Sequence, residues 1–344
     1  MDAQTAKGAL CGISPTSGWG FAWGNGPVFD AVISMLPWNL WLFRGDRIAL
    51  EATYPALLRY LAYEQSVETS PGLVANGLDD WNAKEKSHKP TAEYVISCLR
   101  LEIVETAAKI AEALGKTADV AVHRASAERI RAALRAKYAK GNGVFDNGGQ
   151  TAQAMAVACG LAAPAERQAV ADRLADSVLK TDCHADFGRA GAKYVYRALA
   201  DVGRADLAYR MIVNQTEPTM MKWIGKNGTL WEDWTFGYSK SHVMLGDFSA
   251  WAFEYVAGLR RPLAPGYRTA LVEPVLLPGL SWVRGETETP YGRLASSWTL
   301  SGRDFALTVV VPSGCEAVVR LPDGSERTVG AGTHAFACPA ITRR

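Results

Sequence analysis

The sequence has almost no excess of either charge. Its 37 lysine and arginine residues are nearly balanced by 35 aspartate and glutamate residues, which gives a formal net charge of +2 at pH 7. Proteins that bind nucleic acid or anionic membranes carry a basic surface that attracts phosphate groups. We therefore expect neither nucleic acid nor a membrane as a partner, and we interpret the charged run at residues 84–89 as a solvated loop.

The sequence also lacks a metal-binding motif. Its six cysteines are scattered without a Cys-x-x-Cys pair, and it contains only five histidines. Asp79 and Asp80 are adjacent carboxylates, but no histidine or second acidic pair lies at ligand spacing from them. We expect no metal, no cofactor and reduced thiols. Cys315 and Cys338 fall where two strands could face each other, and the sequence leaves a disulfide bridge between them open.

Long apolar runs are absent too. None reaches the length of a membrane span, and the residues after Met1 show no secretory signal. The expected location is the cytoplasm. The oligomeric state is left open.

What is present is the pattern of a mainly α-helical chain. A length of 344 residues favours two domains. Apolar residues recur at helical spacing in segments that end at glycines such as Gly45, Gly115 and Gly203, so we expect helices joined in antiparallel pairs. The expected helical segments are residues 28–44, 47–61, 91–114, 119–139, 151–159, 164–179, 188–199, 205–213 and 248–259.

Helix pairs in series can close into an (α/α)6 toroid, although the segments counted here fall short of the twelve helices of a complete ring. We expect the informative loops to meet at one mouth: residues 19–30, 78–82, 143–150, 181–188 and 227–242. After Pro262 the pattern alternates with period two and is broken by Gly-containing turns, which predicts a small all-β sandwich. The expected domains are therefore 1–262 and 263–344, with Glu286 and Glu288 in a polar connection between strands.

Tryptophan and ionisable side chains are most concentrated in the string Asn227-Gly-Thr-Leu-Trp-Glu-Asp-Trp234, with His242 shortly after it. Aromatic rings can pack on the apolar face of a sugar, and a carboxylate beside them can activate water. We expect Trp231 and Trp234 to contact substrate. The alternative is that both indoles anchor the core and that Glu232 and Asp233 are loop carboxylates.

The chain resembles the bacterial α-L-rhamnosidases over nearly its whole length. The strings that carry the resemblance are Phe29-Asp-Ala-Val, Leu36-Pro-Trp38, Arg44-Gly-Asp46, Asp79-Asp-Trp81, Gly149-Gln-Thr-Ala-Gln-Ala154, Trp231-Glu-Asp-Trp234, Ser241-His242, Pro290-Tyr-Gly-Arg-Leu-Ala-Ser-Ser-Trp298 and Val311-Pro-Ser-Gly314. The resemblance implies a six-hairpin glycosidase domain, a C-terminal β-sandwich, and hydrolysis of terminal α-L-rhamnose with inversion.

The resemblance also implies roles for individual residues. Glu232 matches the catalytic base and His242 a histidine that contacts the sugar. Trp81 matches an aromatic wall of the rhamnose pocket, with Asp80 beside it as a further substrate contact.

Asp30 falls at an acidic position that lines the same mouth. The family has a tryptophan two residues before it, where this sequence has Val28. We expect Trp19 or Trp23 to replace that tryptophan in contacting the substrate.

The sequence departs from the family's pattern at the general acid, the group that protonates the leaving oxygen. The family carries it in an Asp-Glu-Arg…Gly-Trp…Gly-Asp segment upstream of the Asp30 region, and these 344 residues contain no such segment. The favoured interpretation is an N-terminally truncated form with weak or no activity. The less favoured one is that Asp79, Asp80 or Asp146 serves as the acid.

Two further alternatives stay open: a lyase or a glycosidase for another sugar, with Tyr238 or His242 as base, and a catalytically silent sugar-binding protein. The run Cys183-His184 with Asp186 is interpreted as a polar loop and not as a nucleophile pair.

Overall fold

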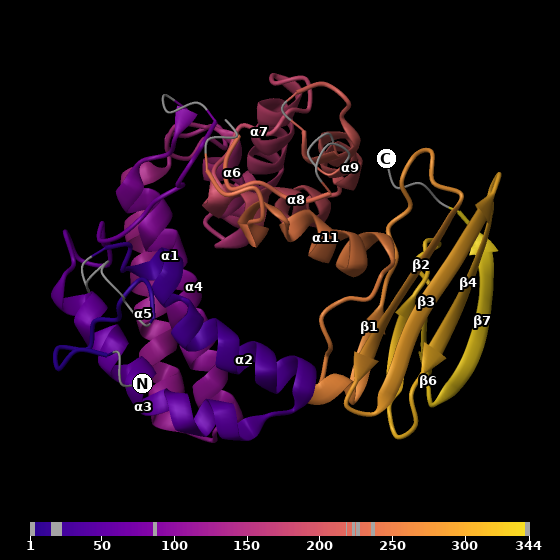
Figure 1. Cartoon of the computed structure of the whole chain (residues 1–344), viewed down its shortest axis with the longest axis horizontal. Coiled ribbons are helices and arrows are strands. Elements are labelled where there is room, and N and C mark those ends of the chain that lie inside the picture. Colours follow the sequence, from indigo (N-terminus) through magenta and orange to yellow (C-terminus); the bar gives the residue numbers. More distant parts are fainter. Residues whose placement is uncertain are drawn as a thin grey trace. The chain divides into compact units, whose positions relative to one another are not determined.

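Figure 1 shows a computed structural model of the chain. It describes residues 4–14, 23–84, 88–217, 219–221, 224, 228–234 and 238–340. The chain packs as two compact units, Met1–Trp38 with Ile48–Gly246, and Asn39–Arg47 with Asp247–Arg344. The second unit therefore includes residues upstream of the boundary expected at residue 262.

The first unit is built from helices. Their bounds are α1 (Pro27–Asp30), α2 (Val32–Arg44, shared with the second unit), α3 (Arg47–Ser66), α4 (Ala92–Ala113), α5 (Thr117–Tyr138), α6 (Gln150–Ala158), α7 (Arg167–Leu179), α8 (Arg189–Asp201) and α9 (Ala205–Val213). Short 3-10 turns lie at Pro164–Glu166 and Val243–Leu245.

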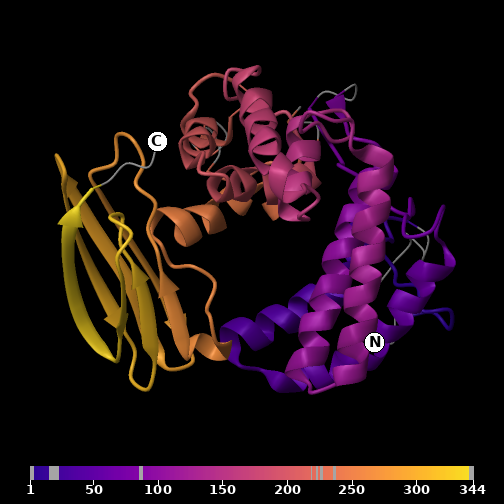
Figure 2. The ribbon, with the colours of Figure 1, turned by 180° about the vertical axis from the view of Figure 1, so that it is seen from behind.

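Three of the predicted helix pairs form, whereas α2 and α3, which were also expected as a pair, do not pack extensively on each other. Consecutive helices pack together as α4 with α5, α6 with α7 and α8 with α9, and the long pair α4 and α5 is seen side by side in Figures 1 and 2. The expected glycine stops are confirmed, because Gly45, Gly115 and Gly203 have φ of 71°, 74° and 79°, a left-handed conformation that glycine adopts without steric cost.

The core of the first unit lies along α4. Most of this helix is buried, including Tyr94 and Leu101, and it contacts α1, α5 and α6. Helix α6 packs closely on α8, because a Cβ added at Gly191 would lie 2.3 Å from Thr151 Oγ1. Glycine is therefore required where the first turn of α6 and the first turn of α8 approach each other.

The second unit contains two sheets. One has the strand order β1-β5-β6 and the other β2-β3-β4-β7, the latter antiparallel throughout. The strands are β1 (Thr269–Val272), β2 (Trp282–Thr289), β3 (Gly292–Ser301), β4 (Asp304–Val311), β5 (Glu316–Arg320), β6 (Glu326–Val329) and β7 (Gly332–Pro339). The alternating burial of β4 confirms the predicted period of two.

Two details of this unit differ from expectation. Glu286 and Glu288 lie within β2 and not in a connection between strands. β2 is an edge strand that alternates between exposed and half-buried positions, so it shows no apolar alternation in the sequence. The helix expected at 248–259 is α11 (Asp247–Trp251), followed by a π-helical turn at Ala252–Val256.

The helical end of the second unit is joined to its sheet by a buried indole. Trp298 Nε1 on β3 donates to the carbonyl oxygen of Val256 over 2.8 Å. All six cysteines are free thiols, so Cys315 and Cys338 form no bridge. In the part of the chain that the structure describes, no helix is both long and apolar enough to cross a lipid bilayer.

Candidate functional site

Two of the loops expected to converge, residues 78–82 and 181–188, meet the first turn of α6 at the carboxylate of Asp80. Thr151 Oγ1 donates to Asp80 Oδ2 over 2.6 Å, and the backbone N–H groups of Gly188 and Gly191 donate to the two carboxylate oxygens over 3.0 Å each. Asp80 is 1% exposed. It thus caps the N-terminus of α8 from a distant loop and fixes where that helix begins.

Arg189 is the first residue of α8 and reaches the last of the expected loops. Its backbone N–H donates to the Trp81 carbonyl over 3.0 Å, and its guanidinium carbon lies 6.0 Å from the centre of the Trp81 ring. Arg189 Nη2 donates to Glu232 Oε1 over 2.8 Å, and the Arg189 side chain is only 6% exposed. This ion pair joins the Trp81 loop, α8 and the Trp-Glu-Asp-Trp segment.

Backbone pairing holds Glu232 in place. Glu232 N–H donates to the Ser239 carbonyl over 2.8 Å, and His242 N–H donates to the Leu230 carbonyl over 2.9 Å. The Ser239 N–H in turn donates to Glu232 Oε2 over 3.1 Å. The Glu232 side chain remains 24% exposed, so both oxygens have partners while water can still reach the carboxylate.

The surroundings of Glu232 keep it ionised. Partial burial raises the pKa of this carboxyl, but the Ser239 N–H, the hydrogen bond and charge of Arg189, and the charge of His242 together lower it below its ordinary value. A carboxylate in this state at neutral pH can accept a proton. Arg189, which holds this carboxylate, also donates its backbone N–H to the Trp81 carbonyl, so Glu232 lies where these loops converge.

His242 lies next to the Glu232–Arg189 pair. Its Nδ1 accepts the Met244 N–H over 3.4 Å at the start of a 3-10 turn. Burial lowers the pKa of this imidazole, the Arg189 charge lowers it further, and the Glu232 charge opposes both. The ring is therefore neutral at pH 7, and its Nε2 carries the proton because Nδ1 is an acceptor.

Trp231 and Trp234 are buried, at 3% and 6% exposed. Trp234 Nε1 donates to the Phe187 carbonyl over 2.7 Å, and its ring packs edge-on against the Phe187 ring. Lys240 Nζ lies 5.5 Å from the Trp231 ring centre. This packing favours the alternative in which both indoles anchor the loop, and a direct substrate contact by either stays a prediction.

Two further predicted substrate contacts, Asp30 and Trp23, belong to the N-terminal part of the chain. Asp30, at the end of α1, is 1% exposed and accepts the Gly26 N–H over 2.8 Å. Burial raises the pKa of Asp30 to about 7, Gly26 opposes this, and the Glu64 charge adds to it. Trp23 is 39% exposed, while Trp19 lies outside the described residues. The roles of Asp30 and Trp23 stay predictions.

The carboxylates considered as replacement acids are all engaged. Asp79 pairs with Lys89 Nζ over 2.7 Å. Asp146 accepts the backbone N–H and the hydroxyl of Thr91 at the start of α4, over 2.8 and 2.6 Å. Burial raises the pKa of Asp80 above its ordinary value, and the hydrogen bonds from Thr151, Gly191 and Gly188 oppose that rise. These contacts are structural ones.

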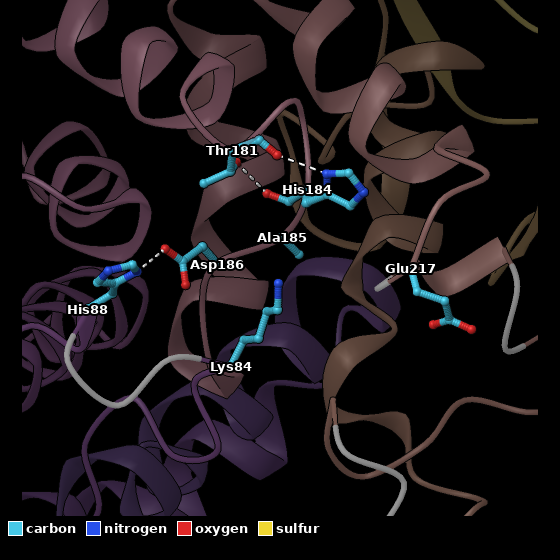
Figure 3. Close-up of a pocket in the computed structure, with 7 residues that line it drawn as sticks. All are labelled: Lys84, His88, Thr181, His184, Ala185, Asp186 and Glu217. Atoms are coloured by element: carbon cyan, nitrogen blue, oxygen red, sulfur yellow. Dashed lines mark hydrogen bonds and ion pairs between the residues drawn. The ribbon is translucent and has the colours of Figure 1, made fainter.

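Among the described residues, no group of three or more His, Cys, Asp or Glu side chains is arranged to hold a metal ion. His184 does not pair with Cys183. Its Nδ1 contacts the Thr181 carbonyl at 2.8 Å and its Nε2 contacts Thr216 Oγ1 at 2.8 Å. These are the contacts of a polar loop and not those of a nucleophile pair (Figure 3).

Sequence reasoning missed Arg189 and Ser239. A signal for Arg189 existed, because a cation in the first turn of a helix opposes the helix dipole and needs an anion nearby. Ser239 acts through its backbone N–H, which leaves no signature in the residue type.

Comparison with known proteins matches two family models in series. The model described as the bacterial alpha-L-rhamnosidase 6 hairpin glycosidase domain matches residues 1–256. The model described as the bacterial alpha-L-rhamnosidase C-terminal domain matches residues 258–336. Together they account for nearly the whole chain.

Curated relatives carry the same description. An alpha-L-rhamnosidase of Formosa agariphila is 27% identical over 339 residues, which cover 90% of this chain and 34% of that protein. One of Streptomyces avermitilis is 29% identical over 344 residues, covering 93% of this chain and 32% of that protein. The chain spans about a third of the length of these relatives.

Solved structures agree on the fold. The Streptomyces avermitilis alpha-L-rhamnosidase complexed with L-rhamnose superposes with a TM-score of 0.90 at 27% identity, over 98% of this chain and 35% of that one. The Dictyoglumus thermophilum enzyme gives 0.89 at 23% identity, over 98% and 42%. The predicted fold class, helical hairpins of the toroid type followed by a small β domain, is confirmed.

Proposed function

The chain belongs to the bacterial α-L-rhamnosidase family, and on that premise we propose that it supplies the catalytic base for hydrolysis of terminal α-L-rhamnosides. Glu232 is the base in this proposal. The substrate is a carbohydrate, and water replaces the leaving group with inversion at the anomeric carbon.

The observation that carries the proposal is the state of the Glu232 carboxylate. It is partly exposed, at 24%, and is held by Arg189 and by the Ser239 N–H. These contacts lower its pKa, so it is ionised at neutral pH. Each carboxylate oxygen has two lone pairs, which leaves room for a water molecule to donate a hydrogen bond to Glu232 as well.

In this mechanism Glu232 takes a proton from the water as its oxygen attacks the anomeric carbon. Arg189 fixes the direction of the carboxylate, and the neutral His242 offers Nε2–H as a donor to a sugar hydroxyl. Inversion also needs an acid that protonates the leaving oxygen. We propose that Asp79, Asp80 and Asp146 do not supply it, because Asp80 and Asp146 are buried and Asp79 is paired with Lys89. The proposal assigns only the base to these 344 residues.

The test uses a substrate that needs no acid. The 2,4-dinitrophenolate ion leaves without protonation, so hydrolysis of 2,4-dinitrophenyl α-L-rhamnoside reports the base alone. We expect the chain to release dinitrophenol and Glu232→Gln to be slower by about 100- to 10,000-fold, the usual effect of losing a general base.

The matched control is Glu112→Gln, a substitution of the same type at an exposed helical glutamate paired with Arg124. It should leave the rate unchanged. Equal rates for Glu232→Gln and the parent chain would contradict the assignment of Glu232 as the base. Binding of L-rhamnose without any turnover would instead favour the silent sugar-binding protein.

A further inference from the structure

β7 forms one edge of its sheet and carries no charged side chain. Among the described residues it pairs with β4 alone, and Figures 1 and 2 show it as the outermost strand of the sheet. Its sequence, Gly-Thr-His-Ala-Phe-Ala-Cys-Pro, includes no lysine, arginine, aspartate or glutamate. Soluble proteins usually protect an edge strand with charges, bulges or a covering segment, because its unpaired backbone groups can bind another strand.

The opposite edge of the same sheet is protected in this way. β2 places Arg284, Glu286 and Glu288 at exposed positions along its length. A strand that paired with β2 would have to crowd these charges and remove water from them. The two edges of one sheet therefore differ, since β2 resists pairing with another strand and β7 does not.

The free hydrogen-bonding groups of β7 belong to alternate residues. Ala340, just after the strand, donates its N–H to the Arg303 carbonyl over 2.7 Å. Hydrogen-bonded and non-hydrogen-bonded pairs alternate along an antiparallel ladder. Counting back in the register of β4 and β7, the N–H and C=O groups that point away from β4 are those of Thr333, Ala335 and Ala337.

The side chains at these positions let a second strand approach. Thr333, Ala335 and Ala337 are all small and exposed. Pro339 belongs to the same alternate set, so its missing N–H costs no hydrogen bond to β4. This edge can therefore accept a strand without removing a charge from water or displacing a large side chain.

The edge is complementary to itself. When two copies of β7 lie antiparallel with Ala335 opposite its own copy, Thr333 faces Ala337 of the partner subunit. All three outward-facing residues then take part in pairs that exchange two hydrogen bonds each. On the other face of the sheet, His334 lies opposite Phe336 of the partner subunit, and aromatic cross-strand pairs of this kind stabilise a sheet.

The same residues determine the register. Moving the centre of the pair by one residue towards the C-terminus would place Thr333 opposite Pro339, which has no N–H to donate. Moving it by one residue towards the N-terminus would place Ala337 opposite residue 331, which lies outside the strand. Only the register centred on Ala335 uses every free group of the edge.

We propose that the chain forms a two-fold symmetric dimer in which β7 pairs antiparallel with β7 of a second copy, so that two four-stranded sheets become one. A two-fold contact uses the same edge on both subunits and closes on itself. Pairing of β7 with β2 of another copy would instead leave free edges and continue into a filament. The contact area is small, so we expect a dissociation constant in the micromolar range.

Sedimentation equilibrium of the full chain at micromolar concentrations tests the dimer. We expect twice the 37.1 kDa of one chain, with the single-chain mass returning on dilution. Ala335→Lys places two ammonium groups opposite each other at the two-fold axis, so this variant should stay monomeric. Its fold should be retained, because the Ala335 side chain is exposed. Thr299→Lys, exposed on β3 of the same sheet, is the matched control and should dimerise as the parent does.

Cross-linking tests the register. Opposite residues in a hydrogen-bonded antiparallel pair have Cα atoms about 5.5 Å apart, a separation that a disulfide can span. Under mild oxidation by dissolved oxygen, we expect Ala335→Cys to give a covalent dimer. Ala306→Cys, exposed on the neighbouring strand β4, is the control and should stay uncoupled. Both variants also carry Cys338→Ser, which removes the native thiol of β7.

The results that would overturn the proposal are distinct. A parent chain that stays monomeric throughout the micromolar range would exclude the dimer. A dimer that persists in Ala335→Lys, or that cross-links Ala306→Cys as readily as Ala335→Cys, would place the contact on another surface. None of these measurements depends on catalysis, so the dimer and the proposed function stand or fall separately.

Discussion

Arg189 occupies a position where a cation is unfavourable for the helix that carries it. The N-terminus of a helix bears a partial positive charge, so an arginine in the first turn of α8 is stabilised only by a nearby anion. Glu232 supplies that anion at 2.8 Å. Each side chain thus explains the position of the other, and Arg189 acts on Glu232 as a positioning residue.

Substitution Arg189→Met should therefore change the pH dependence of the reaction and not only its rate. Removing the guanidinium takes away a hydrogen bond and a charge that lower the pKa of Glu232. The acidic limb of the kcat/KM profile for 2,4-dinitrophenyl α-L-rhamnoside should move to higher pH. Arg173→Met, at an exposed position on α7, is the control. An acidic limb that stays in place would mean that Arg189 has only a structural role.

Asp30 is a buried carboxyl group that lies near Glu64 and Tyr60. Burial holds the pKa of its carboxyl at about 7, against 3.8 for an exposed aspartate. The folded chain therefore keeps this proton over a pH range in which the unfolded chain has lost it. Between about pH 4 and pH 7 the folded state binds more protons, so each rise in pH lowers its stability relative to the unfolded state.

We expect Asp30→Asn to flatten this dependence. Asparagine cannot ionise, so the contribution of Asp30, up to about 1.4 kcal/mol per pH unit between pH 4 and 7, disappears. Urea unfolding at pH 4.5 and 6.5 measures it. Asp172→Asn, at an exposed position where the carboxylate accepts from Gln168, is the matched control. A variant with the same slope as the parent would show that Asp30 is ionised in the folded chain.

At the scale of elements, the start of α8 depends on Asp80. Its carboxylate accepts the backbone N–H of Gly188 just before the helix, the backbone N–H of Gly191 in its first turn, and the hydroxyl of Thr151 on α6. The same turn carries Arg189, so the cap that fixes the helix also aims the guanidinium at Glu232. Asp80, which the sequence predicted as a substrate contact, therefore positions Arg189 and, through it, Glu232.

Asp80→Ala should destabilise the protein strongly. It leaves three buried donors without an acceptor, which costs about 3 kcal/mol and corresponds to a fall in Tm of about 6–12 °C for a unit of this size. Differential scanning fluorimetry measures the shift, with Asp172→Ala as the exposed control. A Tm within one or two degrees of the parent would contradict the capping role.

The elements that the sequence predicted well are those with local signals. Helices α4 and α5 follow from apolar periodicity and from the glycine stop at residue 115, and the turn glycines before and between the strands follow from turn chemistry. β2 was missed because an edge strand with one polar face lacks alternation. An element can be predicted when its residue types are constrained by neighbours along the chain, as in α4 and α5. It is missed when they are not, as in β2.

The site was predicted less completely. Glu232 and His242 could be assigned because they lie ten residues apart in one motif that resembles a family. The Asp80–Gly188 pair joins residues 108 positions apart. Such pairs depend on the tertiary fold, so residue types alone could not reveal them. The burial of Trp231 and Trp234 was left open for the same reason.

At the scale of the whole molecule, the chain consists of a helical unit that carries every residue discussed as catalytic or substrate-binding, and a second unit built on two sheets. Both units match the rhamnosidase family in order. The chain spans about a third of its curated relatives. What these residues contribute is therefore tested best by an assay in which the role of Glu232 is isolated from the rest of the reaction.

The most direct such measurement is chemical rescue of Glu232→Ala. Azide needs no deprotonation, so it can attack from the space left by the missing side chain and replace the base and its water. With 2,4-dinitrophenyl α-L-rhamnoside, we expect azide to restore dinitrophenol release in Glu232→Ala and to yield β-L-rhamnosyl azide, identified by proton NMR, while the parent chain forms L-rhamnose. An azide-insensitive variant, or a rhamnosyl azide of retained α configuration, would contradict the assignment of Glu232 as the base.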